Sequence, residues 1–399
     1  MLRPFLFALS LAACTITAAN AASGSGPGYT ETEIRIGNLA PYSGPASSYS
    51  VIAETQAAYF NMINEAGGIG GRKIKFMSLD DAYSPPKAVE QTRRLVESED
   101  VAALFNPIGT PSNAAIQRYL NSKKVPQLFV GTGASRFNDP KGSPWTVGYN
   151  ATYETEARVY GKYLLANKPD AKIAILVQND DSGRDQVHGL EVGLGDKAKS
   201  MIIAKATYEP SDAVIDSQIL KLKASGADVF VSFGTPKAGS QAIRKVAELG
   251  WKPLYFLANT QSSVASVLTP AGLDNAKGLI SSTSYKDVSD PTWDKDPDVV
   301  AFKAFVEKRM PGVSYTNANV TYGYVTAQTM VQVLKQCGAD VSRENIIKQA
   351  LSLKGFAPAL ILPGITLNTS PEDHEPMQQL QLIRFDGERW SPLGPVLSE

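Results

Sequence analysis

The chain has 399 residues, of which 43% are hydrophobic, 20% charged and 9% aromatic, a size that suits a fold of two lobes with a buried core. Lysine plus arginine and aspartate plus glutamate number 39 each, so the chain lacks the basic excess of a nucleic-acid-binding protein. With only two histidines and two cysteines, it has too few ligands for a His/Cys zinc site.

The first two dozen residues have the pattern of a secretory signal peptide. A short basic start and an apolar run lead to Ala19-Asn20-Ala21, an A-x-A pattern that predicts cleavage before Ala22 and removal of residues 1–21. In a second interpretation, Leu11-Ala12-Ala13-Cys14 is a lipoprotein signal and Cys14 is acylated. In either case Cys337 has no disulfide partner, and we expect it to be a small buried hydrophobic residue.

Strands and helices alternate in the first half of the exported chain. Ile52, Tyr59 and Ile63 recur at helical spacing, and Gly67-Gly68 ends that helix. This βαβ alternation predicts a parallel sheet with helices on both faces. Strands are expected at 34–39, 73–79, 101–106 and 127–130, and helices at about 52–66, 85–96 and 112–120.

The alternation then restarts, which predicts a second lobe. Ile173–Val177 is an unbroken apolar run, typical of a strand buried on both faces. Near the end, 379–385 alternates in polarity and Asp386-Gly387 indicates a hairpin turn. The fold class is therefore α/β, with two doubly wound parallel-sheet lobes. Further strands are expected at 229–233 and 254–257, and helices at about 157–165, 215–222, 242–249, 299–310 and 324–334.

The sequence contains no familiar catalytic motif, such as G-x-S-x-G, H-E-x-x-H or a P-loop. Gly67–Gly71 follows a helix and precedes a strand, which is the wrong order for a dinucleotide loop. Asp80-Asp81 and Asp180-Asp181 follow strands, where loop carboxylates and helix caps are common. His188 and His374 are expected at the surface. We predict no enzymatic activity, no cofactor and no metal.

Small neutral polar residues instead gather where strands end. Ligands of open α/β sheets bind at the carboxyl ends of the strands, where hydroxyls and free N–H groups of helix N-termini can hold a carboxylate without a buried cation. We therefore expect a polar ligand-binding cleft. The clusters are 42–45, 109–112, 132–135, 182–183, 234–235 and 259–261.

Several segments resemble the branched-chain amino-acid type of periplasmic solute-binding proteins, from about Ile34 to Trp390. This resemblance implies a bilobal type I binding-protein fold in the periplasm. It also implies that a small solute is captured by lobe closure and delivered to an ABC permease. A monomer suits a protein that must hand over its ligand. The segments are Tyr42-Ser43-Gly44-Pro45 with Tyr49, Asn64-Glu65-Ala66-Gly67-Gly68-Ile69, Asp80-Asp81, 125–135 and 173–183.

The resemblance also implies three crossings between the lobes. We place them near Gly148-Tyr149, Ser282-Thr283-Ser284 and Pro363–Leu367. The expected N-terminal lobe is then 22–148 plus 285–362, and the C-terminal lobe 149–284 plus 363–399.

Candidate ligand-binding residues follow from the same resemblance. Tyr49 would form a wall of the cleft. The first lobe would bind the carboxylate of the ligand, and the second lobe would lie on the opposite side of the cleft. The first-lobe residues are Gly109, Thr110, Thr132, Gly133, Ala134 and Ser135, and the second-lobe residues are Ser182, Thr235 and Asn259.

Three departures from the family pattern bear on the ligand. The amino-acid binders place an acid at about the position of Asn259, where a neutral side chain cannot compensate a buried ammonium. They carry an aromatic residue near Ser182, and their half-cystines correspond to Tyr83 and Ile108. We therefore expect a carboxylate without an α-amino group, such as an aromatic or other organic acid. The alternative is a module that senses amides or amino acids with a signalling partner.

Overall fold

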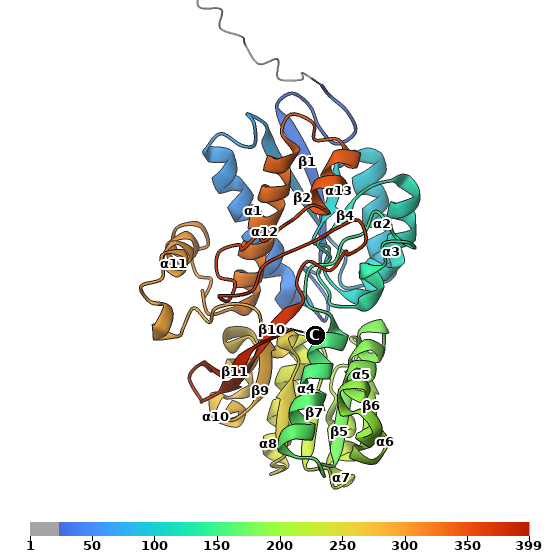
Figure 1. The fold of residues 1–399 in the computed structure, drawn as a ribbon, viewed down its shortest axis with the longest axis vertical. Coiled ribbons are helices and arrows are strands. Elements are labelled where there is room, and N and C mark those ends of the chain that lie inside the picture. The colour runs from blue at the N-terminus through green and yellow to red at the C-terminus, as the bar shows by residue number, and fades with distance from the viewer. Residues whose placement is uncertain (1–23, 399) are drawn as a thin grey trace, which may run out of the picture.

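Two separate sheets form the centres of two lobes that meet at a hinge (Figure 1). The computed structural model describes residues 24–398, so the expected signal peptide and Cys14 lie outside the described residues. Within that range, no helix combines the length and apolar character that a membrane crossing requires.

The first lobe is built on a parallel sheet of strand order β2-β1-β3-β4. Ile36 and Phe105 belong to the core on the side of α1 and α12, whereas Leu39 and Leu104 face α2 and α3. Alternate residues of these strands thus bury both faces of the sheet. The elements are β1 (Glu33–Ala40), α1 (Ser50–Glu65), β2 (Lys73–Asp80), α2 (Pro85–Arg93), β3 (Ala103–Phe105), α3 (Thr110–Lys123), β4 (Gln127–Leu128), α11 (Pro297–Arg309), α12 (Ala318–Cys337) and α13 (Arg343–Ala350).

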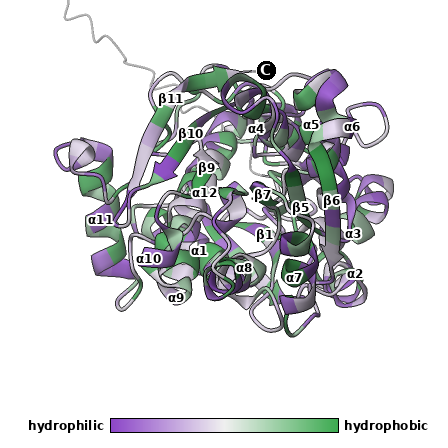
Figure 2. Ribbon diagram, turned by 90° about the horizontal axis from the view of Figure 1, so that it is seen from below, coloured by the Kyte–Doolittle hydropathy of each residue, from purple (hydrophilic) through white to green (hydrophobic). Residues whose placement is uncertain are grey.

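The second lobe has a sheet of order β11-β10-β9-β8-β7-β5-β6, in which β10 runs antiparallel to both β9 and β11. Figure 2 shows hydrophobic β5 among the surrounding helices. The elements are α4 (Tyr153–Asn167), β5 (Ile173–Gln178), α5 (Asp181–Leu194), α6 (Ala198–Met201), β6 (Ile202–Tyr208), α7 (Asp216–Ala224), β7 (Val229–Ser232), α8 (Pro236–Glu248), β8 (Leu254–Leu257), α9 (Thr269–Ala271), α10 (Leu273–Ala276), β9 (Ile280–Thr283), β10 (Gln379–Phe385) and β11 (Trp390–Ser398).

The predicted doubly wound α/β architecture is confirmed, but sequence analysis missed β6 and β9. In β6, residues from Ile202 to Lys205 alternate between half-buried and exposed positions, because this strand lies at the edge of the sheet. In β9, Ser281 and Ser282 are buried, so the strand has no apolar run. The apolar pattern that identifies a strand is weak in both cases.

The chain crosses between the lobes at three places. Tyr149 packs in the first core and Ala151 in the second, and the next crossing follows β9. The third crossing expected at Pro363–Leu367 is wrong, because Ile365, Leu367 and Met377 all belong to the first core. Residues 363–377 therefore lie with the first lobe, and the chain crosses just before β10.

His374 is another correction. It was expected at the surface, yet its side chain is only 1% exposed. Its Nδ1 lies 2.7 Å from the carbonyl oxygen of Thr146, and its own carbonyl accepts the N–H of Gly148 at 3.0 Å. The acidic loop around His374 thus lies beside the first crossing and turns the imidazole inward. By contrast, His188 on α5 is exposed, and Cys337 is buried as predicted.

Candidate functional site

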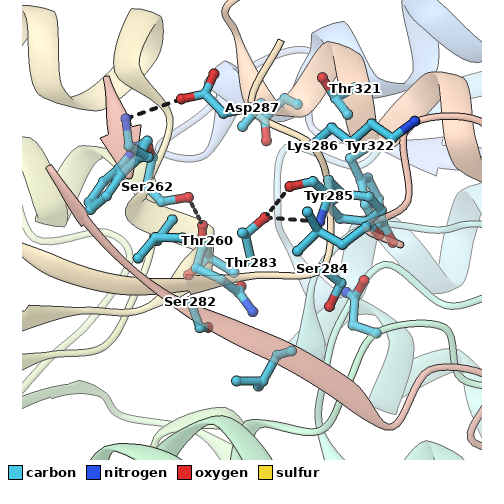
Figure 3. A pocket seen from close by; sticks show the side chains of 18 of the residues that line it. Thr260, Ser262, Ser282, Thr283, Ser284, Tyr285, Lys286, Asp287, Thr321 and Tyr322 are labelled. Atoms are coloured by element: carbon cyan, nitrogen blue, oxygen red, sulfur yellow. Dashed lines mark hydrogen bonds between the residues drawn. The ribbon is translucent and has the colours of Figure 1, made fainter. Parts of the chain in front are cut away.

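A cavity of about 320 Å³ lies between the lobes and extends along the hinge. Figure 3 shows its hinge side, where residues 282–287 pass between the lobes. Both lobes and the hinge contribute to its walls. First-lobe residues include Tyr49, Tyr83, Ile108, Gly109, Tyr322 and Met377; second-lobe residues include Tyr153, Asn259, Thr260, Ser262 and Leu380; hinge residues include Asn150, Ser284 and Tyr285.

We call the part of the cavity lined by Tyr49, Tyr83 and Tyr153 its inner end. Tyrosine hydroxyls are the main polar groups there. Tyr49, Tyr83 and Tyr153 are close enough to interact electrostatically. Burial raises the pKa of Tyr153 to about 12 and holds the pKa values of Tyr49 and Tyr83 well above their usual range. At neutral pH the phenols therefore keep their protons and can donate hydrogen bonds to a ligand oxygen.

Gly109 occupies a position that only glycine fits. Its φ is +97°, and a Cβ atom there would lie 2.3 Å from Cε2 of Tyr83. The Tyr83 ring therefore packs directly against the backbone that opens α3. Tyr83 and Ile108, which we expected at the family's half-cystine positions, both line the cavity, so an aromatic ring contacts the ligand space at Tyr83.

Asn259 lines the cavity directly after β8. Its backbone N–H donates to Oε1 of Glu156 at 2.8 Å, and the same oxygen accepts from the hydroxyls of Ser282 at 2.6 Å and Tyr160 at 2.9 Å. Glu156 is 0% exposed, and burial raises its pKa. Glu156 therefore links α4 to Asn259 and to β9 by hydrogen bonds. It does not itself line the cavity.

Three of the predicted ligand-binding residues, Tyr49, Gly109 and Asn259, line the cavity. Tyr49 of the first lobe and Thr260 of the second are close enough to interact, so the two lobes meet across the cleft at this point. The other seven candidates lie outside the cavity lining: Thr110, Thr132, Gly133, Ala134, Ser135, Ser182 and Thr235.

Several of these seven hold the binding loops in place. The hydroxyls of Thr110 and Thr132 lie 2.6 Å apart, which ties the start of α3 to the loop after β4. The carbonyl of Gly133 accepts the N–H of Tyr153 at 2.8 Å, and the N–H of Ala134 donates to the Thr132 hydroxyl at 3.1 Å. These contacts hold the loop after β4 against the start of α4 and so support Tyr153.

Ser135 and Arg136 connect the two lobes. The N–H and hydroxyl of Ser135 donate to Oδ2 of Asp185 at 2.8 and 3.1 Å. Arg136 Nη1 lies 2.6 Å from Oδ2 of Asp181. Both acids belong to α5 in the second lobe, so these contacts hold the lobes together in the conformation described here.

Ser182 and Thr235 face their own lobe rather than the cavity. The Ser182 hydroxyl donates to Asp180 Oδ1, and Asp180 caps α5 by accepting the N–H of Gly183 at 3.2 Å. The N–H of Thr235 donates to the Tyr208 hydroxyl at 2.9 Å. Ser182 and Thr235 therefore make contacts within the second lobe and do not line the cavity.

Charge is confined to the outer part of the cavity. Among the described residues that line it, the charged ones are Lys286, Asp287 and Asp290. The ammonium of Lys286 lies 2.7 Å from Asp296, and Asp287 accepts the N–H of Trp390 at 3.1 Å. The inner end is therefore neutral. Residues 24–398 hold no group of three or more His, Cys, Asp or Glu side chains that could bind a metal ion.

Sequence reasoning missed Tyr153 and Tyr322 as cavity residues. Tyr153 opens α4 immediately after the first crossing, so its place next to a hinge was a usable indication. Tyr322 lies in the first turns of α12. The sequence around it gave no comparable indication, because its position depends on how α12 packs beside the hinge. Its hydroxyl accepts from Nδ2 of Asn106 at 2.9 Å.

Comparisons with known proteins agree with this architecture. The family described as "Periplasmic binding protein" matches residues 33–389. A Leu/Ile/Val-binding protein homolog 7 from Brucella abortus is 25% identical over 368 residues, which cover 87% of this chain and 85% of that protein.

Two solved structures share the fold. A branched-chain amino acid ABC transporter protein from Thermus thermophilus with bound valine is 16% identical, with a TM-score of 0.82 over 92% of this chain and 97% of that one. A solute-binding protein of an ABC transporter from R. palustris in complex with benzoate is 19% identical, with a TM-score of 0.77 over 92% and 98%.

Proposed function

Because this chain belongs to the periplasmic binding protein family, we propose that it captures a small carboxylate-bearing solute and delivers it to an ABC permease. The ligand is an aromatic or other organic acid without an α-amino group. The protein acts in the periplasm as a monomer, after removal of residues 1–21 or, alternatively, after lipidation at Cys14. The two lobes close over the ligand, and no bond is made or broken.

The neutral inner end of the cavity carries this proposal. Protonated tyrosine hydroxyls are donors, which suits a carboxylate. An ammonium would need a carboxylate partner, but Asn259 occupies the cavity wall there. Glu156 beneath it is already engaged by three donors. The valine-bound and benzoate-bound structures share this fold, and the lining of this chain favours the second kind of ligand.

A thermal-shift screen of the protein from Ala22 onward tests the proposal. The panel contains leucine, isoleucine, valine and glutamate, benzoate-type and cinnamate-type acids, and primary amides. A ligand at about 100 times its dissociation constant stabilises by roughly 2.7 kcal/mol, which raises Tm by several degrees. Stabilisation by organic acids alone supports the proposal. Stabilisation by branched-chain amino acids overturns it.

The alternative is a module that senses amides or amino acids with a signalling partner, and an amide also suits a neutral cavity lining. Stabilisation by the amides and not by the acids would favour it. Neighbouring genes then separate the two roles, because a permease and an ATPase accompany transport, whereas a kinase accompanies sensing.

A further inference from the structure

The cavity does not end at the cleft between the lobes. It continues past Thr260 and Ser262 into a second compartment beside the hinge. We call this compartment the side chamber, and its walls come from three separate parts of the chain: the segment after β9, the segment before α12, and the β10–β11 hairpin. Its main lining residues are Val288, Trp293, Tyr315, Ile383, Trp390 and Pro392.

Polar and charged groups around the side chamber are already paired. Lys286 lies 2.7 Å from Asp296 and 3.9 Å from Asp298, and its ammonium sits 5.2 Å from the ring centre of Trp293. Asp287, labelled in Figure 3, accepts from the N–H of Trp390, and it also accepts from the hydroxyl of Ser289.

Two further polar groups of the side chamber are also paired. The indole N–H of Trp390 donates to the carbonyl of Ser262 at 2.8 Å, and Asp290 accepts the N–H of Thr292 at 2.9 Å. A ligand that reaches this compartment therefore finds few free donors or acceptors, and it meets mainly aromatic and aliphatic surface.

The two ends of one cavity thus differ in chemistry. The inner end presents the hydroxyls of Tyr49, Tyr83 and Tyr153, whereas the side chamber presents the rings of Trp293, Tyr315 and Trp390 beside charged groups that are already paired. We infer that the ligand is an elongated amphipathic acid, whose carboxylate binds at the inner end and whose aryl-alkyl or acyl chain extends into the side chamber. This inference rests on the proposed function for the carboxylate, but the length of the ligand follows from the side chamber alone.

A matched pair of variants tests the side chamber. Ala318 is exposed, lines the cavity and is the first residue of α12. Ala318→Trp places a bulky ring at the chamber without removing the cap from Asn317, which accepts the N–H of Asn319. Val300→Trp is the control, because Val300 is 51% exposed on α11 and lies outside the cavity lining.

Calorimetry with benzoate, 3-phenylpropanoate and 5-phenylpentanoate, and with the three corresponding primary amides, gives the readout. In the wild type each added methylene that becomes buried should tighten binding about four-fold. Ala318→Trp should weaken 5-phenylpentanoate binding by about ten-fold or more, since several methylenes lose their place. Benzoate affinity should be unchanged, and Val300→Trp should behave as the wild type.

The two series separate the side chamber from the proposed function. If the acids bind with no dependence on length, or Ala318→Trp weakens all acids equally, the side-chamber inference is wrong and the carboxylate proposal stands. If only the amides bind and their affinity rises with length, the carboxylate proposal is wrong and the side chamber stands. Binding in neither series contradicts both.

Discussion

The backbone N–H of Asn259 donates to Oε1 of Glu156 at 2.8 Å, so a residue of the cavity wall is held by an acid that is fully buried beneath it. The second carboxylate oxygen of Glu156 has no hydrogen-bond partner among the described residues. A buried charge on that oxygen would be costly, which favours the protonated form.

Glu156 should make stability depend on pH. Burial raises its pKa in the folded protein, although hydrogen bonds from Ser282, Asn259 and Tyr160 oppose the shift. The folded state therefore binds the proton more tightly than the unfolded chain, whose glutamate pKa is about 4.3. The free energy of unfolding should fall as pH rises from about 4.3 through the raised pKa. Glu156→Gln, which resembles the neutral form, should remove this loss.

Urea unfolding at about pH 5 and about pH 8 measures the effect. Glu54→Gln, at an exposed position on α1, is the control and should keep the wild-type pH dependence. An equal pH dependence in Glu156→Gln and the wild type would contradict the proposed protonation.

Gly109→Ala should destabilise the protein more than an ordinary glycine replacement. The new Cβ would meet the Tyr83 ring at 2.3 Å, in addition to the strain of φ +97°. Gly226→Ala is a matched control, because Gly226 has φ +77° but open space around it. Backbone strain alone costs about 1–2 kcal/mol, and Gly109→Ala should exceed the control in urea unfolding and should weaken ligand binding.

A double-mutant cycle with Tyr83→Ala isolates the clash between Gly109→Ala and the ring. The cost of Gly109→Ala should shrink when Tyr83 is already truncated. If the two changes are additive, the ring does not require glycine at this position.

Arg136→Gln should weaken ligand binding through the lobe–lobe contact. Arg136 pairs with Asp181 across the cleft at 2.6 Å, and both side chains are partly exposed, so the expected loss is about 0.2–1 kcal/mol, or roughly 1.5- to 5-fold in Kd. The difference from the wild type should diminish at high salt. Arg309→Gln breaks the pair with Glu65, which joins α11 and α1 within the first lobe, and should leave Kd unchanged. Equal Kd values for all three proteins would show that the Arg136–Asp181 pair does not support closure.

Asn259→Asp should discriminate between ligand classes. A carboxylate in the cavity wall repels a bound carboxylate at close range in a partly buried site. We expect affinity for organic acids to fall by about ten-fold or more, with a smaller change for primary amides of the same shape. Titration of both ligand classes measures this, and a parallel loss for acids and amides would indicate a packing defect instead.

The strands could be predicted wherever burial on both faces produced an apolar run, as in Ile173–Val177. The cavity residues Gly109 and Asn259 could be predicted because each follows the carboxyl end of a strand, where the topology brings loops together. Tyr49 was implied only by the family resemblance. Tyr322 and Trp293 could not be predicted, since their places depend on the packing of segments without regular periodicity.

The same reason explains the errors at Pro363–Leu367 and His374. Residues 363–377 contain no described helix or strand, so neither periodicity nor spacing indicates which lobe they join. Their position follows from the burial of Ile365, Leu367 and Met377 in the first core.

Paired calorimetric titrations of leucine and 4-methylpentanoate test the central claim most directly, because the two molecules differ only in the α-amino group. Both present the same branched chain and the same carboxylate to the cavity. The account predicts that 4-methylpentanoate binds and that leucine binds more weakly, because Asn259 offers no charge to an ammonium. Tighter binding of leucine would contradict it and would mean that another residue supplies the counter-charge.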